Sequence, residues 1–330
     1  MFFSDALLFP SEGPLLPAPV GRLAPSPTGV LHLGNVRSFL LAWLSVRAQG
    51  GTILLRIEDI DGPRVKAESI EQTIELLTWL GLDWDGEPLI QSTRLAQHEA
   101  AIDRLFERGR IYPCICTRKE VEEAASAPHE SATDGAPVDG AIYPGTCRGR
   151  FSSVEEARAR SGRDPALRAR VDIPALPFDD GFLGRVPGAI VGDFVVGKRD
   201  GTPSYQLAVV VDDADQGVTE VVRADDLVPS PPRQLLLYRE LGRTPPAFTH
   251  VPLVVGQDGR RLAKRHGDTS VEHFRREGKS AEQIIGCVAA LAGLLDAPRA
   301  CQPSELIDAF AWDCVPRDPV VGEDPEFPSP

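Results

Sequence analysis

The chain has 330 residues, of which 42% are hydrophobic and 25% are charged, the usual balance for a globular protein with a substantial buried core. Its net charge of −13 argues against a general attraction to polyanions, and its six cysteines do not suggest a disulfide scaffold. Because no apolar run reaches the roughly 18 residues of a membrane span and the N-terminus lacks the basic start of a signal peptide, we expect a cytoplasmic protein without a membrane partner.

The first regular elements of the chain have the pattern of a strand, a helix and a second strand. An apolar strand at residues 20–24 leads into a turn rich in Pro and Gly, and a helix is expected from about Gly34 to Gly50. A second apolar strand follows at residues 53–57. In such a βαβ unit the turn and the helix N-terminus lie together, and the unpaired N–H groups of that terminus attract phosphate. His32 lies in this turn.

Helices and strands alternate along the rest of the chain. Apolar spacing predicts helices at residues 70–81, 95–109, 235–241 and 280–295, helices that begin near Ser152, Ser204 and Ser304, and strands near 190–196, 218–223 and 251–256. Two pairs, Ser152 with Glu155 and Ser280 with Gln283, have the spacing of capping boxes. We therefore predict an α/β fold with a doubly wound, Rossmann-like parallel sheet, an inserted segment and a small helical C-terminal region.

The inserted segment carries three of the cysteines. Cys114, Cys116 and Cys147 offer three thiolates, which are ligands that suit Zn²⁺ in a closed site of four ligands. Two residues compete for the fourth position: His129 is the ordinary chemical choice, whereas Tyr143 is an unusual one. A metal-free insertion with buried thiols is the alternative.

Four motifs, in order along the chain, resemble those of the glutamyl branch of class I aminoacyl-tRNA synthetases. Residues 25–35 (Pro-Ser-Pro-Thr-Gly-Val-Leu-His-Leu-Gly-Asn) are similar to the HIGH motif, and residues 261–265 (Arg-Leu-Ala-Lys-Arg) to the KMSKS loop. Residues 56–61 (Arg-Ile-Glu-Asp-Ile-Asp) and 204–213 (Ser-Tyr-Gln-Leu-Ala-Val-Val-Val-Asp-Asp) resemble two further motifs of that branch. With its Cys-x-Cys and Tyr-x-x-x-Cys sequences and only a short stretch after the KMSKS-like loop, the chain specifically resembles the glutamyl-queuosine tRNA(Asp) synthetases.

This resemblance implies an enzyme that activates L-glutamate with ATP in the absence of tRNA. The glutamyl group would then pass to the queuosine base in the anticodon of tRNA(Asp). Mg²⁺ is expected with ATP and one structural Zn²⁺ in the insertion, and no obligate protein partner is evident. One alternative is a minimal glutamyl-tRNA synthetase that charges a tRNA 3′ end. Another is a non-catalytic paralogue that binds glutamate or tRNA, which the departures from the KMSKS pattern at Arg261 and Arg265 would favour.

The resemblance also assigns residues to the two substrates and to the metal. His32 and Lys264 are the candidate catalytic residues, although a satisfied turn histidine and a solvated basic turn are the alternatives for them. The ATP site is expected to contain His32, Gly34, Asn35, Arg261, Lys264 and Arg265. The glutamate site is expected to contain Arg22, Leu23, Ala24, Pro25, Ser26, Glu58, Tyr205 and Arg223. Within it, Glu58 would bind the α-amino group and the arginines the carboxylates. The zinc ligands implied are Cys114, Cys116, Tyr143 and Cys147.

Two assignments stay open, and five segments are expected. Asp59 and Asp61 either belong to the glutamate site or are ordinary acids at the end of a strand. The expected segments are a flexible N-terminal extension (1–20), a Rossmann-like catalytic domain in two halves (21–111 and 151–255), a zinc-binding insertion between the halves (112–150), and the KMSKS-like loop with a helical C-terminal region (256–330).

Overall fold

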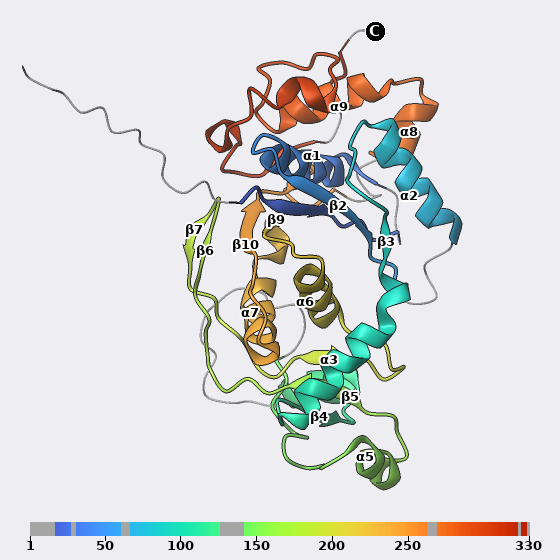
Figure 1. The fold of residues 1–330 in the computed structure, drawn as a ribbon, viewed down its shortest axis with the longest axis vertical. Coiled ribbons are helices and arrows are strands. Elements are labelled where there is room, and N and C mark those ends of the chain that lie inside the picture. Colours follow the sequence, from blue (N-terminus) through green and yellow to red (C-terminus); the bar gives the residue numbers. More distant parts are fainter. Residues whose placement is uncertain are drawn as a thin grey trace, which may run out of the picture.

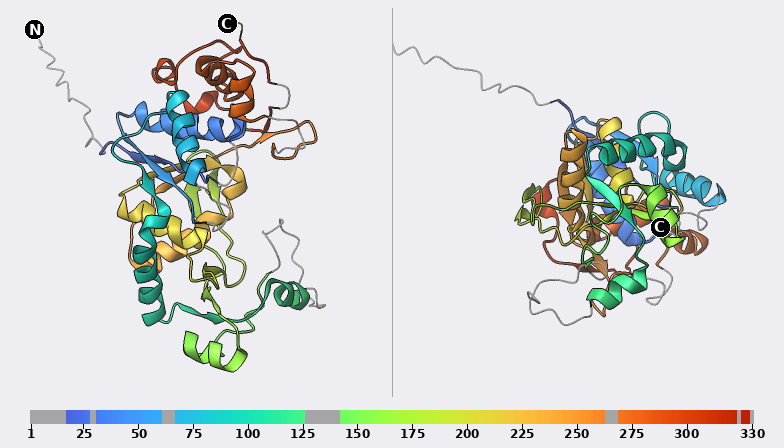
Figure 2. Two further views of the ribbon diagram at one scale, coloured as in Figure 1. Left: turned by 90° about the vertical axis from the view of Figure 1, so that its right-hand side faces the viewer. Right: turned by 90° about the horizontal axis from the view of Figure 1, so that it is seen from below.

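The computed structural model describes residues 17–27, 31–60, 67–125, 142–262, 269–322 and 325–328. The molecule is elongated, with the C-terminal helices at one end, the cysteine-bearing segment at the other, and parallel strands between them (Figure 1; Figure 2). Within the described ranges, no helix combines the length and the apolar character needed to cross a lipid bilayer.

The N-terminal part forms a parallel sheet around the predicted strand–helix–strand unit. Strand β1 (Val20–Leu23) pairs with β2 (Thr52–Ile57), and β2 pairs with β3 (Leu89–Ile90), all in parallel. The connecting helix α1 (Leu33–Arg47) is buried along most of its length. Gly50, at φ 66°, adopts the left-handed conformation that lets the chain turn from the end of α1 into β2.

A second sheet continues from the first on the other side of β1. Strand β9 (Glu220–Ala224) pairs in parallel with β10 (Ala247–Val251), β10 pairs in parallel with β6 (Phe178–Asp180), and β6 pairs antiparallel with β7 (Gly184–Val186). The backbone N–H of Thr219, just before β9, donates to the carbonyl of Val20 at 2.8 Å and joins the two sheets. The direction of strand succession reverses between β1 and β9, and such a switch point is where ligands bind in open α/β sheets.

Helices cover both faces of these sheets, as the predicted doubly wound fold requires. Helix α1 lies on one face, and α6 (Tyr205–Asp215) and α7 (Ser230–Leu241) lie on the other (Figure 1). Successive strand residues point to opposite faces. In β2, Ile53, Leu55 and Ile57 therefore pack into the core beneath α1, and Leu54 packs against the core beside α6. The predicted fold class is confirmed.

The remaining elements form the two ends of the molecule and the connections between them. The cysteine-bearing end has a three-stranded antiparallel sheet of β4 (Ile111–Cys114), β5 (Ala166–Ala169) and β8 (Val195–Gly197), with α4 (Arg118–Ala125) and α5 (Val154–Ser161) beside it. The other end has α8 (Val271–Arg276), α9 (Ala281–Leu291), and β11 (Val254–Val255) paired in parallel with β12 (Val320–Val321). The connections contain α2 (Ala67–Trp79), α3 (Leu95–Glu107) and short 3₁₀ turns at Gln91–Arg94, Asp225–Leu227, Pro303–Leu306 and Trp312–Cys314.

Several predicted boundaries need correction. The predicted capping box at Ser152 and Glu155 is displaced by one residue, because Ser153 caps α5 and the carboxylate of Glu156 accepts from Ser152. The element predicted from Ser304 is a 3₁₀ turn rather than an α-helix. The box at Ser280 and Gln283 is confirmed, with reciprocal hydrogen bonds of 3.2 and 3.0 Å.

Other predicted helix and strand boundaries also differ from those of the structure. The helix predicted at 235–241 begins five residues earlier, the one predicted at 280–295 ends at residue 291, and the strand predicted at 251–256 is reduced to residues 254–255. The cysteine-bearing sheet also draws on residues beyond 150, through β5 and β8. Helix α9 ends early because Gly293, at φ 74°, takes the left-handed conformation that helices do not continue through.

Gly286 allows helix α9 to pack closely against the chain segment that follows the helix. A Cβ at this position would overlap the backbone carbonyl oxygen of Arg299. Alanine gains about 1 kcal/mol of helix propensity over glycine, but a backbone atom cannot rotate away as a side chain can. We therefore expect Gly286→Ala to lower the free energy of unfolding by about 1–3 kcal/mol in urea denaturation. Ala290→Ser, at a half-buried position of the same helix, serves as the control; a Gly286→Ala protein as stable as the parent would contradict this packing.

Candidate active site

A cavity of about 520 Å³ opens at the carboxyl ends of β1, β2 and β9, at the switch point of the sheet. The predicted glutamate-site residues that line it are Arg22, Ala24, Pro25, Ser26, Glu58, Tyr205 and Arg223. His32, Asn35 and Arg261 of the predicted ATP site line the same cavity. Leu23 does not, because strand alternation turns its side chain to the opposite face, where it is fully buried in the core.

Behind Arg22 and Glu58, which line the cavity, lies an ionic network centred on Arg56, whose side chain has no exposed surface. Its guanidinium lies 2.7 Å from the carboxylate of Asp213 and 3.1 Å from that of Glu58. Arg22 lies 3.7 Å from the same Asp213 oxygen. Although burial opposes its charged form, the nearby carboxylates of Asp213 and Glu58 raise the pKa of Arg56, so it stays protonated. Arg56 thus holds Glu58 and Asp213 in fixed positions beside Arg22.

Arg56 and Asp213 were not singled out as site residues in the sequence, although both lie in motifs that were. Their signal was present. Asp213 is the second of two acids that follow the apolar run of residues 207–211, and Arg56 lies inside an apolar strand; such charged residues are rarely buried unless they are paired. The sequence does not show that these two residues pair with each other, because 157 positions separate them.

Arg223, at the far side of the cavity, has neutral partners only. Its guanidinium donates to the Tyr205 hydroxyl at 3.2 Å, to Oε1 of Gln234 at 3.0 Å and to Nε2 of His250 at 3.0 Å. Among the residues that the structure describes, no carboxylate lies within ion-pair distance of Arg223. Its charge is therefore oriented but not compensated. Sequence reasoning missed Gln234 and His250, which are both fully buried.

His32 is the N-cap residue of α1 and is held by the chain around it. Its backbone N–H donates to Oδ1 of Asn35 at 3.1 Å, so the amide nitrogen of Asn35 is the side-chain atom left as a donor. Thr269 lies on the other side, with its hydroxyl 3.4 Å from Nδ1 of His32 and its carbonyl accepting from the N–H of Leu33. The residues after the KMSKS-like segment therefore contact the HIGH-like turn directly.

A second cavity of about 380 Å³ adjoins the first and shares several of its lining residues. It is lined by His32, Gly34, Asn35, Ser38, Ala224, Leu253, Val254, Arg261 and Leu262. Lys264 and Arg265, predicted for the ATP site, lie outside the described residues, as does Asp61. Arg261 forms an ion pair with Asp226 at 2.6 Å. Asp59 accepts from the N–H and the hydroxyl of Ser92, at 2.7 and 2.6 Å, and does not line either cavity.

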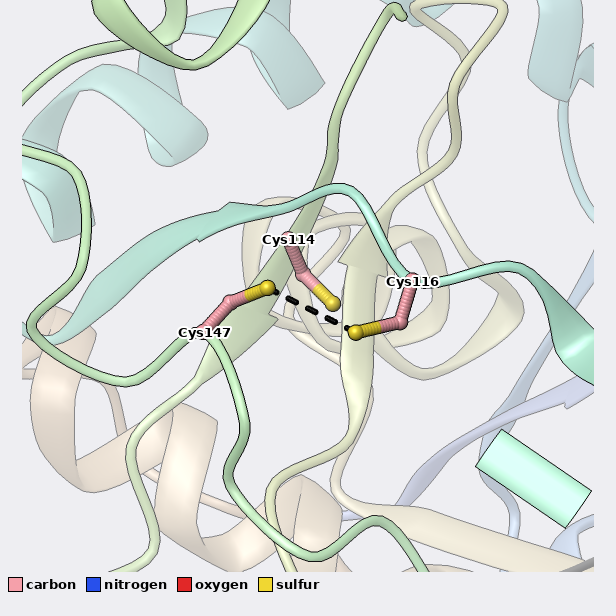
Figure 3. Close-up of side chains that lie close together, drawn as sticks. All are labelled: Cys114, Cys116 and Cys147. Carbon is pink, nitrogen blue, oxygen red and sulfur yellow. Dashed lines mark hydrogen bonds between the residues drawn. The ribbon is translucent and has the colours of Figure 1, made fainter. Parts of the chain in front are cut away.

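Three thiols meet at the other end of the molecule, where Cys114, Cys116 and Cys147 point toward one another (Figure 3). Their sulfur atoms all lie within 4.8 Å of one another, and those of Cys116 and Cys147 are 3.5 Å apart. Ligand atoms around a tetrahedral zinc with bonds of about 2.3 Å are about 3.8 Å apart. The cluster is therefore consistent with a metal site.

Tyr143 belongs to the same cluster. Its hydroxyl lies 3.3 Å from Sγ of Cys114 and 3.8 Å from Sγ of Cys116. Arg168 stacks on the Tyr143 ring at 3.8 Å and places its Nε 3.3 Å from Sγ of Cys114, where a cation would balance thiolate charge. Burial and the neighbouring Cys114 raise the pKa of Cys116 to about 12, so without a metal ion this thiol is protonated. His129, the competing fourth ligand, lies outside the described residues.

Known proteins share this architecture. Residues 20–318 match the model of the catalytic domain of class I tRNA synthetases (E and Q). The glutamyl-Q tRNA(Asp) synthetase of Symbiobacterium thermophilum is 48% identical over 310 residues, which span 91% of this chain and 94% of that protein. The glutamate–tRNA ligase of Coprothermobacter proteolyticus is 39% identical over 88% of this chain and 62% of that protein.

A solved structure agrees with these sequence matches. The crystal structure of a glutamate tRNA ligase from Elizabethkingia meningosepticum, in complex with its amino acid, superposes with a TM-score of 0.75 at 26% identity. The superposition covers 92% of this chain and 67% of that one.

The ionic network makes a prediction about stability. Asp213→Asn would leave Arg56 and Arg22 buried with less compensating charge, and breaking a buried pair of this kind costs about 3 kcal/mol or more. We expect that loss in the free energy of unfolding measured by denaturant titration. Asp215→Asn removes a partly exposed partner of Arg94 and Arg243 and should cost less than about 1 kcal/mol. Equal losses in the two variants would show that the network contributes no more than a surface ion pair.

Proposed function

Because this chain belongs to the class I glutamyl- and glutaminyl-tRNA synthetase family, and within it to the glutamyl-Q tRNA(Asp) synthetases, we propose that it activates L-glutamate with ATP and transfers the glutamyl group to the queuosine base in the anticodon of tRNA(Asp). The observation that carries this proposal is the cavity in which Arg22, Arg223 and Glu58 converge beside the HIGH-like turn. It offers partners for two carboxylates and one ammonium next to a site for a nucleotide.

The charges of the cavity suit glutamate. Arg22, Arg223 and Arg261 line the cavity together with the carboxylates of Glu58 and Asp226, and the buried Arg56–Asp213 pair beneath adds no net charge. The formal charge of the unliganded cavity is therefore +1. Glutamate carries a net charge of −1 and would neutralise it. Glutamine has no side-chain charge and would leave the excess positive charge buried, which is unfavourable. We therefore assign Glu58 to the α-amino group, and Arg22 and Arg223 to the carboxylates.

Activation is the attack of a glutamate carboxylate oxygen on the α-phosphorus of ATP. A P–O bond forms there as the bond to the bridging oxygen of pyrophosphate breaks, and the electron pair leaves with pyrophosphate. Catalysis of such a step consists mostly of positioning and charge stabilisation. We assign that work to His32 and the amide nitrogen of Asn35, together with the N-terminus of α1 at Gly34. Lys264, Arg261 and Arg265 are assigned to the phosphates, and Mg²⁺ bound with ATP would neutralise part of their charge.

We assign one structural Zn²⁺ to Cys114, Cys116, Tyr143 and Cys147. The Tyr143 hydroxyl lies 3.3 and 3.8 Å from the sulfurs of Cys114 and Cys116, and the sulfurs of Cys116 and Cys147 are 3.5 Å apart. These distances fit the ligand spacing of a tetrahedral site. Four protein ligands close such a site, so the ion would support the antiparallel sheet of β4, β5 and β8 rather than take part in chemistry.

The choice between this reaction and the charging of a tRNA 3′ end rests on similarity. The chain is more similar to the glutamyl-Q tRNA(Asp) synthetase than to the glutamate–tRNA ligase, and it covers nearly all of the former's length. This favours tRNA(Asp) carrying queuosine as the RNA partner.

Pyrophosphate exchange tests the activation step. We expect labelled pyrophosphate to enter ATP when glutamate is present and tRNA is absent, and we expect glutamine to be inactive at the same concentration. Arg223→Met removes a charged donor and should raise the KM for glutamate by about 100-fold, since hydrogen bonds to charged groups contribute about 1.5–3 kcal/mol. No exchange with glutamate, with or without tRNA, would favour the non-catalytic paralogue instead.

Metal content tests the zinc assignment. Purified protein should contain one equivalent of zinc by elemental analysis, and Cys147→Ser should lose it because a thiolate ligand is removed. Cys287→Ser, at a buried cysteine outside the cluster, is the matched control and should retain it. Tyr143→Phe should release zinc to a chelator faster than His129→Ala does; the reverse order would make His129 the fourth ligand.

A further inference from the structure

Arg223 is held in place by a chain of buried groups that crosses three strands. Asp180 ends β6, His250 lies in the neighbouring β10, and Arg223 lies in β9, where it is the direct partner of His250 in the parallel register. Nδ1 of His250 lies 2.6 Å from Oδ2 of Asp180, and its Nε2 lies 3.0 Å from Nε of Arg223. The line of hydrogen bonds runs across the sheet and ends at the cavity.

The partners of His250 fix its protonation. An arginine can only donate, so Nε2 of His250 must carry the lone pair. The ring proton must then be on Nδ1, where the carboxylate of Asp180 accepts it. Burial lowers the pKa of His250 and the charge of Arg223 adds to this effect, which agrees with a neutral ring. His250 therefore orients Arg223 without contributing a charge.

The surroundings of Asp180 keep its carboxylate ionised, so that it accepts hydrogen bonds only. Its Oδ1 accepts from the backbone N–H groups of Phe182, Leu183 and His250, at 3.0, 2.9 and 3.1 Å. Burial alone would raise the pKa of Asp180, but the hydrogen bonds from His250 and the backbone outweigh burial and lower it. An ionised carboxylate with both oxygens engaged cannot rotate, so it holds the imidazole in one orientation.

This arrangement leaves some of the N–H groups of Arg223 available to a ligand. The guanidinium has five N–H groups, and three of them donate to Nε2 of His250, the Tyr205 hydroxyl and Oε1 of Gln234. Two N–H groups thus have no partner within the described part of the chain. If an acid stood where His250 stands, the charge of Arg223 would be neutralised before a substrate arrived. A neutral acceptor fixes the direction of the guanidinium and leaves its charge available.

Building on the function proposed above, we propose that Asp180 and His250 are positioning residues that act through Arg223 to set the affinity for glutamate and its preference over glutamine. They do not touch the reacting atoms. Their loss should therefore weaken the binding of glutamate and leave the binding of ATP as it was.

Two substitutions of His250 separate this role from a general packing role. Asparagine keeps a donor for Asp180 but does not reach Arg223, whereas glutamine can place its amide oxygen near the former position of Nε2. In pyrophosphate exchange, His250→Asn should raise the KM for glutamate about tenfold, narrow the preference over glutamine, and leave the KM for ATP unchanged. His250→Gln should restore most of the loss. Asp180→Asn removes the carboxylate that holds the imidazole in one orientation, so it should also raise the KM for glutamate.

The chain offers a matched control in His98, which is also fully buried and lies 3.0 Å from an aspartate, Asp212, but which, unlike His250, is not hydrogen-bonded to Arg223. His98→Asn should lower Tm without changing the KM for glutamate. The proposal is overturned if His250→Asn and Asp180→Asn leave that KM unchanged, or if His98→Asn raises it equally. Calorimetric titration with glutamate gives the same comparison of Kd without catalysis. Failure of the proposed function would look different: the wild-type protein would exchange no pyrophosphate, even if the calorimetric comparison of Kd values came out as expected.

Discussion

The structure depends on one buried ionic network, in which Arg56 joins Asp213 to Glu58 at 2.7 and 3.1 Å. Removing such charges from water costs several kcal/mol per ion, and only fully paired geometry offsets that cost. The parallel strands provide the geometry, because β1, β2 and β9 each turn one arginine toward the face that carries α6. The network holds Arg22 and Glu58, which line the cavity, in fixed positions on this face.

Around that network, the residues proposed to bind the two ends of glutamate are held in different ways. Arg22 and Glu58 belong to the charged network. Their side chains are held in place by it, and their charges are balanced by the opposite charges of Asp213 and Arg56. Arg223 is held by neutral acceptors and keeps its charge for a ligand. The HIGH-like turn adjoins this pocket and is hydrogen-bonded to Thr269, so the proposed nucleotide site lies beside the proposed amino-acid site. Strand β4, which ends at Cys114, lies at the end of the molecule opposite α9 (Figure 1).

Much of this arrangement could be predicted from the sequence where the signal was local. The strand–helix–strand unit, the capping box at Ser280 and the three-cysteine cluster all follow from spacing. Leu23 was misplaced because a contiguous motif gives no indication of which strand residues face the cavity. The partners His250 and Gln234 were missed because each lies one residue before a predicted element, the strand at 251–256 and the helix at 235–241, whereas in the structure both lie within a strand or a helix. The role of His250 arises from Asp180 and Arg223, which lie 70 and 27 positions away.

The most direct test is transfer of labelled glutamate to tRNA. The acceptor should be tRNA(Asp) that carries queuosine and lacks its 3′-terminal adenosine, because a base in the anticodon needs no 3′ end. We expect this RNA to accept glutamate with ATP, and we expect the same tRNA without queuosine, and tRNA(Glu), to remain unlabelled. Label that appears on tRNA(Glu), or that requires the 3′-terminal adenosine, would contradict the account.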